Sequence, residues 1–259
     1  MKPLILLTND DGILSPGLAA AASALDPLGD LLIVAPQEGQ TNLARNLSQM
    51  YGGDGAITKT KVGYQGKTWV GYGVKSTPAL AVVHAVQELA DRQISLSVSG
   101  INFGENAASC VTASGTLGAA LAAAECGIPS LAVSLEIDSL DYHSYDTVED
   151  FSAAIHFTTL VAAKILATAL PQDADMLKLE IPWGASLHTP LVVTRQDRLA
   201  YYQLVIEPLE QLFGTKLDIS QFPSKGKYTA KNTDAFALAE GLVSVTPLSL
   251  DLTARNCLG

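Results

Sequence analysis

Two adjacent carboxylates follow the first apolar run of the chain. Leu4–Thr8 has the length and composition of a buried strand, and Asn9, Asp10, Asp11 and Gly12 end it abruptly. Two like charges at the end of a buried strand raise each other's pKa unless a positive charge lies between them. A hard divalent cation meets that need, because Mg²⁺, Mn²⁺ and Ca²⁺ prefer oxygen ligands. The pair therefore predicts a metal site; the alternative is a plain turn, in which Asp and Gly are frequent.

Oxygen-bearing side chains also follow the next two predicted buried strands. Thr41 lies in the polar loop after the second of these strands, and Asn102 follows the third. Ligands of doubly wound sheets bind at the carboxyl ends of the strands. Asp10 and Asp11, the Thr41 hydroxyl and the Asn102 amide oxygen would then form a partial shell for one cation, completed by water or substrate.

Two other carboxylate motifs do not fit these residues. An EF-hand loop that begins at Asn9 needs a carboxylate at its twelfth position, where Ala20 stands. A phosphatase that forms an aspartyl-phosphate on Asp10 would have a second Asp two residues later, where Gly12 stands. Both interpretations are excluded.

A second polar cluster predicts an anion site. Ser114 can cap the Ala-rich helix predicted at Leu117–Glu125, and the free N–H groups at the start of a helix bind oxyanions. Gly104 and Gly115 would let the backbone approach a ligand closely. The alternative is an ordinary N-cap without a ligand. Neither a Walker motif nor Gly-x-Gly-x-x-Gly occurs, so ATP and NAD binding have no motif support.

Strand-like and helix-like segments alternate through the first part of the chain, which predicts an α/β fold with a doubly wound, mostly parallel sheet. Beyond about residue 185 the pattern changes to short segments that predict antiparallel strands. We therefore expect a single domain over 1–259, with a core at about 1–185, a β-rich arm at about 186–236 and a return to the core at about 237–259. The predicted strands are Leu4–Thr8, Asp30–Ala35, Trp69–Val74, Ile94–Val98, Pro129–Leu135, Met176–Ile181, Leu191–Thr194, Ala200–Val205 and Leu242–Val245; the predicted helices are 16–25, 77–89, 117–125 and 147–170.

Composition restricts the function classes. Apolar residues make up 48% of the 259 residues and charged residues 16%, which provides a large core and excludes disorder. The net charge of −10, without a Lys/Arg cluster, excludes long nucleic acids as partners, while a small phosphorylated substrate remains compatible. No apolar run approaches the roughly 20 residues of a membrane span, and Asn9 interrupts the first run too early for a signal peptide. We therefore expect a cytoplasmic protein.

Ordered short motifs along nearly the whole chain resemble the SurE family, the stationary-phase survival proteins. The motifs are Thr8–Gly12, Ser15–Gly17, Val34–Pro36, Ser76–Pro78, Ser99–Asn102, Gly104, Asn106, Ser114–Thr116, Ala132–Ser134, Val193–Arg195, Thr233–Asp234, Glu240–Pro247 and Asp251–Thr253. The resemblance implies a Rossmann-like core. It also implies a C-terminal β arm exchanged between the subunits of a homodimer or homotetramer.

The resemblance further implies a divalent-metal-dependent 5′-nucleotidase acting on small nucleoside monophosphates. One cation per subunit, Mg²⁺ or Mn²⁺ with Ca²⁺ as a crystallographic substitute, would be bound by Asp10, Asp11, Thr41 and Asn102. Under this hypothesis the phosphate is held by Asn106, Ser114, Gly115 and Thr116, and Asp10 or Asp11 accepts a proton from water. Asn9 would orient the loop or contact the phosphate.

Four positions depart from the pattern of that family. Thr41 replaces a Ser, Asn42 and Ala108 replace Gly, and Ala113 replaces an aromatic residue. These changes motivate two alternatives, a homologue that binds metal and nucleotide with little turnover, and an enzyme for another small phosphoester.

Overall fold

Buried, almost entirely apolar segments form the parallel centre of the sheet. In the computed structural model, which describes residues 2–40, 42–48, 54–137, 150–206, 219–223 and 226–253, β1 (Leu4–Thr8) lies between β2 (Asp30–Pro36) and β5 (Ile94–Phe103). β6 (Ser130–Leu135) and β7 (Met176–Ile181) continue the sheet beyond β5, all in parallel register. Strands covered on both faces are buried along most of their length, and these segments are mostly apolar.

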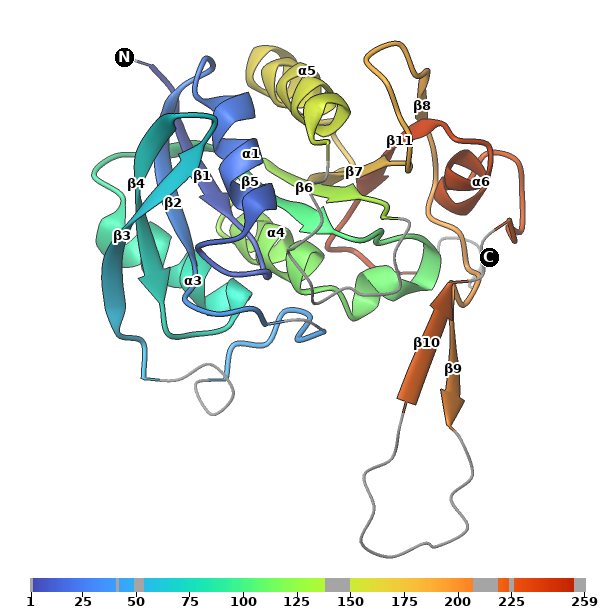
Figure 1. Ribbon diagram of the computed structural model, residues 1–259, viewed down its shortest axis with the longest axis horizontal. Helices are drawn as coiled ribbons and strands as arrows, with labels where there is room; N and C mark the ends of the chain where they lie inside the picture. Colours follow the sequence, from blue (N-terminus) through green and yellow to red (C-terminus); the bar gives the residue numbers. More distant parts are fainter. Residues whose placement is uncertain are drawn as a thin grey trace, which may run out of the picture.

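Additional strands extend both edges of the sheet. β4 (Lys67–Val74) lies parallel to β2, and β3 (Ile57–Tyr64) pairs antiparallel with β4. At the other edge, β11 (Val243–Leu248) is antiparallel to β7, and β8 (Leu191–Val193) is parallel to β11. The order of this nine-stranded sheet is β3-β4-β2-β1-β5-β6-β7-β11-β8 (Figure 1).

The strand order reverses direction between β1 and β5. From β1 the chain adds β2 on one side, and β5, β6 and β7 follow on the other. In open α/β sheets such a reversal leaves a crevice at the carboxyl ends of the two strands, where ligands bind. The loops after β1 and β5 therefore define the place to look for a site.

Helices cover both faces of the sheet. α1 (Pro16–Leu25) and α5 (Ser152–Thr168) pack on one face, and α3 (Pro78–His84) and α4 (Gly115–Glu125) pack on the other. A π-helical turn, η1 (Ala85–Leu89), continues α3. A hydroxyl caps the start of α1, α3 and α4, from Ser15, Thr77 and Ser114, respectively.

The two faces of the sheet differ in polarity. The face under α1 and α5 is an apolar core that includes Ile5, Leu7, Val98 and Leu131. Side chains alternate along each strand, so the opposite face carries the intervening residues. From β1 across to β11 those residues include a buried polar set: Thr8, Ser97, Ser99, Ser130, Ser134, Lys178, Glu180 and Ser244.

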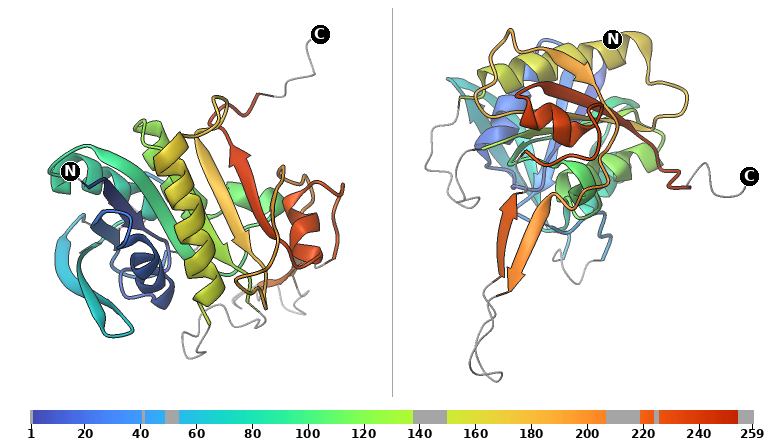
Figure 2. Two further views of the ribbon diagram at one scale, coloured as in Figure 1. Left: turned by 90° about the horizontal axis from the view of Figure 1, so that it is seen from above. Right: turned by 90° about the vertical axis from the view of Figure 1, so that its right-hand side faces the viewer.

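A separate hairpin projects from the body of the molecule. β9 (Tyr202–Ile206) and β10 (Ile219–Pro223) pair antiparallel and point away from the nine-stranded sheet (Figures 1 and 2). α6 (Asp234–Ala239), capped by Thr233, leads the chain back to β11. Within the described part of the predicted arm at 186–236, β8 joins the main sheet, whereas β9 and β10 form a second sheet.

The α/β fold predicted from the sequence is confirmed, with several corrections in detail. Leu191–Thr194 was expected to be antiparallel, but β8 lies parallel to β11 because the chain passes through the hairpin and α6 before it returns. β3, β10 and α6 were not predicted. The helix expected at 147–170 is α5, and residues 147–149 lie outside the described ranges. Within those ranges, no helix combines the length and apolar character of a membrane span.

Candidate metal and phosphate site

The turn after β1 is held by the side chain of Asn9. Its Nδ2 donates to the Ser15 hydroxyl at 2.7 Å and to the Gly12 carbonyl at 3.1 Å, and its Oδ1 accepts the Gly12 N–H at 3.2 Å. Gly12 adopts φ +102°, which side-chain-bearing residues rarely do. Asn9 is fully buried and thus orients the turn that carries the two carboxylates; a contact with phosphate stays a prediction.

Asp10 lies against the first turn of α4. The Thr116 hydroxyl donates to Asp10 Oδ1 at 2.6 Å. A Cβ on Gly115 would lie 2.7 Å from Asp10 Oδ2, so the carboxylate can come this close only because residue 115 is glycine. Burial raises the pKa of Asp10 to about 6, although the hydrogen bonds from Thr116 act in the opposite direction.

Asp11 reaches the end of β5. The Phe103 N–H donates to Asp11 Oδ2 at 3.3 Å. Burial, and then the charge of Asp10, raises the pKa of Asp11 well above its usual range. Next to Phe103, Asn102 donates its Nδ2 to the Gly104 carbonyl at 2.7 Å, which leaves its Oδ1 as the end of the amide suited to a cation.

Thr41 lies outside the described residues, but residues on either side of it are placed. Gln40 donates its N–H to the Asp10 carbonyl at 2.7 Å, and Ala44 donates to the Ala113 carbonyl at 3.0 Å. The loop on both sides of residue 41 is therefore attached to the turn after β1 and to the start of α4. Ligation by Thr41 stays a prediction.

This donor set fits a hard divalent cation. Asp10 and Asp11 are carboxylates whose charged forms are destabilised by burial and by each other, which is the condition that a cation relieves. Asn102 adds an amide oxygen. Across the described part of the chain, no group of three or more His, Cys, Asp or Glu converges, so these donors are hard oxygens rather than a His- or Cys-rich set.

The turn Ser114–Thr116 shows the geometry of a helix cap. The Ser114 hydroxyl accepts the Leu117 N–H at 3.2 Å, and the Thr116 hydroxyl is bonded to Asp10. The side chains of Ser114 and Thr116 therefore already have partners, and a phosphate would be bound at this turn chiefly by backbone N–H groups. That role stays a prediction.

Asn106 is held by side chains that the sequence analysis did not identify. Its N–H donates to Glu180 Oε2 at 3.0 Å, and its carbonyl accepts from Lys178 Nζ at 2.9 Å. Its Nδ2 donates to Ser134 Oγ at 2.9 Å. The sequence of β7 contains a sign of these contacts. Lys178 and Glu180 alternate there with apolar residues, which is unusual in a strand that is otherwise typical of a buried core.

Lys178 connects this loop to the C-terminal part of the chain. Its Nζ lies 2.6 Å from Asp234 Oδ2 and 3.8 Å from Glu180 Oε1, and all three side chains are fully buried. Burial alone would lower the pKa of Lys178, but the charges of Glu180 and Asp234 raise it above its usual value. Asp234 also accepts the Ala108 N–H at 3.0 Å.

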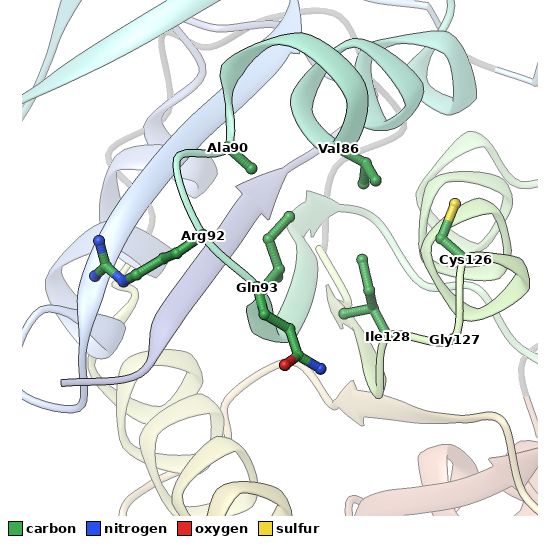
Figure 3. Close-up of a pocket in the computed structure, with 8 residues that line it drawn as sticks. Val86, Ala90, Arg92, Gln93, Cys126, Gly127 and Ile128 are labelled. Carbon is green, nitrogen blue, oxygen red and sulfur yellow. The ribbon is translucent and has the colours of Figure 1, made fainter. Parts of the chain in front are cut away.

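A hollow elsewhere on the molecule is unrelated to this chemistry. It lies where Ile94 begins β5 and where Gly127 and Ile128 precede β6, at the edge of the sheet opposite the carboxylates (Figure 3). Its one charged lining residue, Arg92, is paired with Asp30 at 2.7 Å. The candidate site is therefore at the carboxyl ends of β1 and β5.

Comparison with known proteins agrees with the fold. The family model described as "Survival protein SurE" matches residues 5–203. The chain is 38% identical to "5′-nucleotidase SurE" of Thermococcus gammatolerans, over 97% of this chain and 91% of that protein. It is 34% identical to the protein of the same name from Archaeoglobus fulgidus, over 96% and 92% of the two chains.

A solved structure shows the same architecture. The SurE protein from Aquifex aeolicus superposes with a TM-score of 0.76 at 29% sequence identity, covering 97% of this chain and 95% of that one. The match of the family model and the near full-length relatives establish the family. The chain belongs to the SurE family.

Proposed function

We propose that this protein is a divalent-metal-dependent phosphomonoesterase that hydrolyses nucleoside 5′- or 3′-monophosphates to nucleoside and phosphate. One observation supports this proposal most strongly: Asp10 contacts the first turn of α4, and Asp11 contacts the end of β5. The names of the relatives, 5′-nucleotidase SurE, support the same activity.

Asp10, Asp11 and Asn102, together with Thr41, would hold one Mg²⁺ or Mn²⁺ ion. When bound, such a cation supplies Lewis-acid polarisation of the phosphate group. Burial of Asp10 and Asp11 keeps water from weakening this electrostatic interaction.

The remaining oxygens of the phosphate would be bound by protein donors. The backbone N–H groups of Gly115 and Thr116 lie at the start of α4, where free N–H groups favour an oxyanion, and Ser114 fixes that start as its cap. Asn106 would contribute from the other side of the site. Donors already in place stabilise charge that develops in the transition state.

One of the two carboxylates would accept the proton of the attacking water. Asp10 is bonded to Thr116 through Oδ1, and Asp11 is bonded to the Phe103 N–H through Oδ2. Both follow the carboxyl end of β1, and we assign the general-base function to this pair.

Phosphate release from AMP, GMP, a sugar phosphate and a short polyphosphate, with Mn²⁺ or with EDTA, tests the proposal. We expect Mn²⁺-dependent release from the nucleotides and a loss of at least about 100-fold in kcat/KM for Asp11→Ala. Asp91→Ala is the control, because the Asp91 side chain is 76% exposed. Equal release with EDTA, or by Asp11→Ala, contradicts the proposal. Nucleotide binding without phosphate release supports the alternative of a homologue with little turnover. Phosphate release from the sugar phosphate or the polyphosphate alone supports the alternative of an enzyme for another small phosphoester.

We also propose that the β9–β10 hairpin is exchanged in a cytoplasmic homodimer or homotetramer. An isolated two-stranded hairpin is marginally stable in water, so a second copy that covers it explains how it persists (Figure 2). Light scattering should give two or four times the mass of one chain, and a monomer at micromolar concentration contradicts this.

A further inference from the structure

Several of the buried polar side chains on the sheet face under α3 and α4 bind one residue, Asn106. This residue lies in the loop after β5, and three buried side chains from two other strands bind it. Ser134 in β6 accepts from its side-chain amide, while Lys178 and Glu180 in β7 bind its carbonyl and its N–H. Both backbone polar groups and the side-chain nitrogen of one residue are thereby fixed.

The same side chains extend along the loop to Ala108. Asp234 at the start of α6 binds Lys178 at 2.6 Å and accepts the Ala108 N–H at 3.0 Å. Ala108 has φ +51°, a conformation that a side-chain-bearing residue keeps only when its surroundings impose it. The segment from 106 to 108 is therefore held at both ends by one charged cluster.

Stability alone does not account for this cluster. Three fully buried charges lose their hydration, and well-packed apolar residues at such positions often stabilise a fold equally well or better. A buried charged network instead favours one geometry, because a shift of any member breaks hydrogen bonds that water cannot replace in the interior. In this protein the network fixes the position of Asn106. The Nδ2 of its amide is bonded to Ser134, so the Oδ1 of the amide points away from that hydrogen bond.

We propose that Lys178, Glu180 and Ser134 are positioning residues that hold Asn106 for contact with the phosphate group of the substrate, with Asp234 anchoring Lys178. The inference rests on the proposed function, which supplies the phosphate. None of the four touches the reacting atoms; they act through the backbone and amide of Asn106.

Ser134→Ala tests the proposal with a minimal change. It removes the partner of the Asn106 amide, so the amide can rotate. Ser130→Ala is the control, because Ser130 is on the same face of β6, is equally buried, and donates its hydroxyl to the Ile128 carbonyl at 2.8 Å. The two variants lose comparable hydrogen bonds and should lose comparable thermal stability.

The readouts are KM and kcat for AMP with Mn²⁺, and the dissociation constant of inorganic phosphate measured by calorimetry with Mn²⁺ present. We expect Ser134→Ala to weaken phosphate binding and to raise KM by about fivefold, the effect of one hydrogen bond, with little change in kcat. Ser130→Ala should leave all three constants unchanged. Unchanged constants in Ser134→Ala, or equal changes in both variants, overturn the proposal.

The double variant Lys178→Met with Asp234→Asn tests the charged part of the cluster. Removing both charges avoids leaving the Asp234 carboxylate buried without its cation, and Asn keeps an oxygen for the Ala108 N–H. Glu180, whose pKa burial already raises to about 7 against the effect of Lys178, becomes neutral once Lys178 is removed. We expect a folded protein whose affinity for phosphate is at least about tenfold lower. A folded double variant with wild-type affinity overturns the role of Lys178, and if the double variant does not fold, the serine pair still decides.

The outcomes separate this inference from the proposed function. If wild type releases phosphate but the Ser134 and Lys178 variants bind it normally, only the positioning role fails. If wild type hydrolyses no monophosphate yet binds phosphate through this loop, the proposed function fails and the positioning role stands. Wild type that does not bind phosphate at all contradicts both.

Discussion

At the residue scale, the chemistry depends on two adjacent carboxylates, one buried and one half-buried. Burial raises the pKa of Asp10 to about 6, and burial together with the charge of Asp10 raises the pKa of Asp11 well above its usual range. A protein that keeps two such groups at a strand end pays in stability unless a ligand compensates. The compensation we infer is a divalent cation.

Asp10→Asn should weaken Mn²⁺ binding and phosphate release together. The amide keeps the size of the side chain and can still accept from Thr116, but it removes one of the two charges that attract the cation. We expect the affinity for Mn²⁺ to fall by at least about 100-fold, measured by electron paramagnetic resonance of free Mn²⁺. Asp91→Asn, on the surface, serves as control. An unaltered affinity for Mn²⁺ in Asp10→Asn would exclude Asp10 as a ligand.

Two of the residues that depart from the family pattern lie in the left-handed region of backbone conformation, which favours glycine. Asn42 and Ala108, which replace Gly in that pattern, adopt φ +60° and +51°, respectively. Asn tolerates the left-handed region, whereas Ala is strained there by roughly 1 kcal/mol or more. The backbone thus keeps the conformation for which glycine is suited even where the glycine is absent.

Ala108→Gly should therefore lower Tm less than the same change at an unstrained position. Relief of strain at φ +51° offsets part of the cost of losing a buried methyl group and of the greater freedom of glycine in the unfolded chain. The control is Ala163→Gly in the interior of α5, where the same change should lower Tm by about 2–4 °C. Thermal unfolding followed by circular dichroism compares the two, and an equal fall in Tm would show that residue 108 is not strained.

At the element scale, the base of the arm contacts the loop that carries Asn106. The Tyr202 hydroxyl lies 3.0 Å from Glu105 Oε1 and 3.2 Å from the Glu105 carbonyl. Ala107, Ala108 and Tyr201 belong to one small apolar cluster with residues of α6. The start of β9 and the loop that carries Asn106 are therefore packed as one unit.

Tyr202→Phe should disturb this loop without unfolding the protein. It removes the hydroxyl bonds to Glu105 and keeps the ring. We expect KM for AMP to rise about two- to fivefold, with Tm lowered only slightly. Tyr228→Phe is the control, since Tyr228 packs on Phe236 and is 38% exposed. Steady-state kinetics that show no difference between the variants would rule out coupling between the arm and the loop.

The elements that the sequence predicted are those with strong local signals. β1, β2, β5, β6 and β7 are apolar runs of strand length, and Ser15, Thr77 and Ser114 begin helices as caps. The missed elements lack such signals. Of the eight residues of β3 only Val62 is buried, and α6 has six residues, too few to show a helical period.

The site was predictable to the extent that it lies at strand ends. Asp10 and Asp11 lie just beyond one predicted strand, and Asn102 lies four residues beyond the predicted strand Ile94–Val98, within the longer β5 of the structure. Because these two strands are parallel neighbours, their carboxyl ends lie at the same edge of the sheet. The cluster of Lys178, Glu180 and Asp234 was not predictable in this way, because charges within an apparent core strand give no indication of their partner. Lys178 and Asp234 are 56 positions apart, and only the return of the chain through α6 brings them into contact.

At the scale of the whole molecule, the two faces of the sheet differ in how much buried polarity they carry. The face under α1 and α5 is continuous apolar core, while the opposite face combines smaller apolar clusters under α3 and α4 with the buried hydroxyls and the charged cluster. Those buried polar groups lose hydration, which costs free energy that the apolar face does not incur. We expect their contribution to stability to depend on pH.

Glu180 is the residue whose titration should produce the pH dependence of stability. Burial raises its pKa from 4.5 to about 7, against the opposing effects of Lys178 and the Asn106 N–H; Asp234 and Glu105 add to the rise. A carboxyl group with a raised pKa in the folded state favours folding below its unfolded pKa. That contribution is lost as pH rises from about 4.5 through about 7.

Glu180→Gln should remove this loss while its amide oxygen still accepts from the Asn106 N–H. The free energy of unfolding of the variant, relative to wild type, should therefore increase between pH 5 and pH 8 in urea titrations. Glu240→Gln, at an exposed position, should show no such trend. A difference that is constant with pH would show that Glu180 does not titrate in this range.

The proposed activity requires one cation bound where the loops after β1 and β5 meet. A crystal structure with Mn²⁺ and phosphate, with an anomalous difference map collected at the manganese edge, measures this directly. We predict one strong peak per subunit, within coordination distance of Asp10, Asp11, Asn102 and the Thr41 hydroxyl, with phosphate between the ion and Asn106. A map at saturating Mn²⁺ without a peak there, or with the ion bound by other residues, would contradict the account.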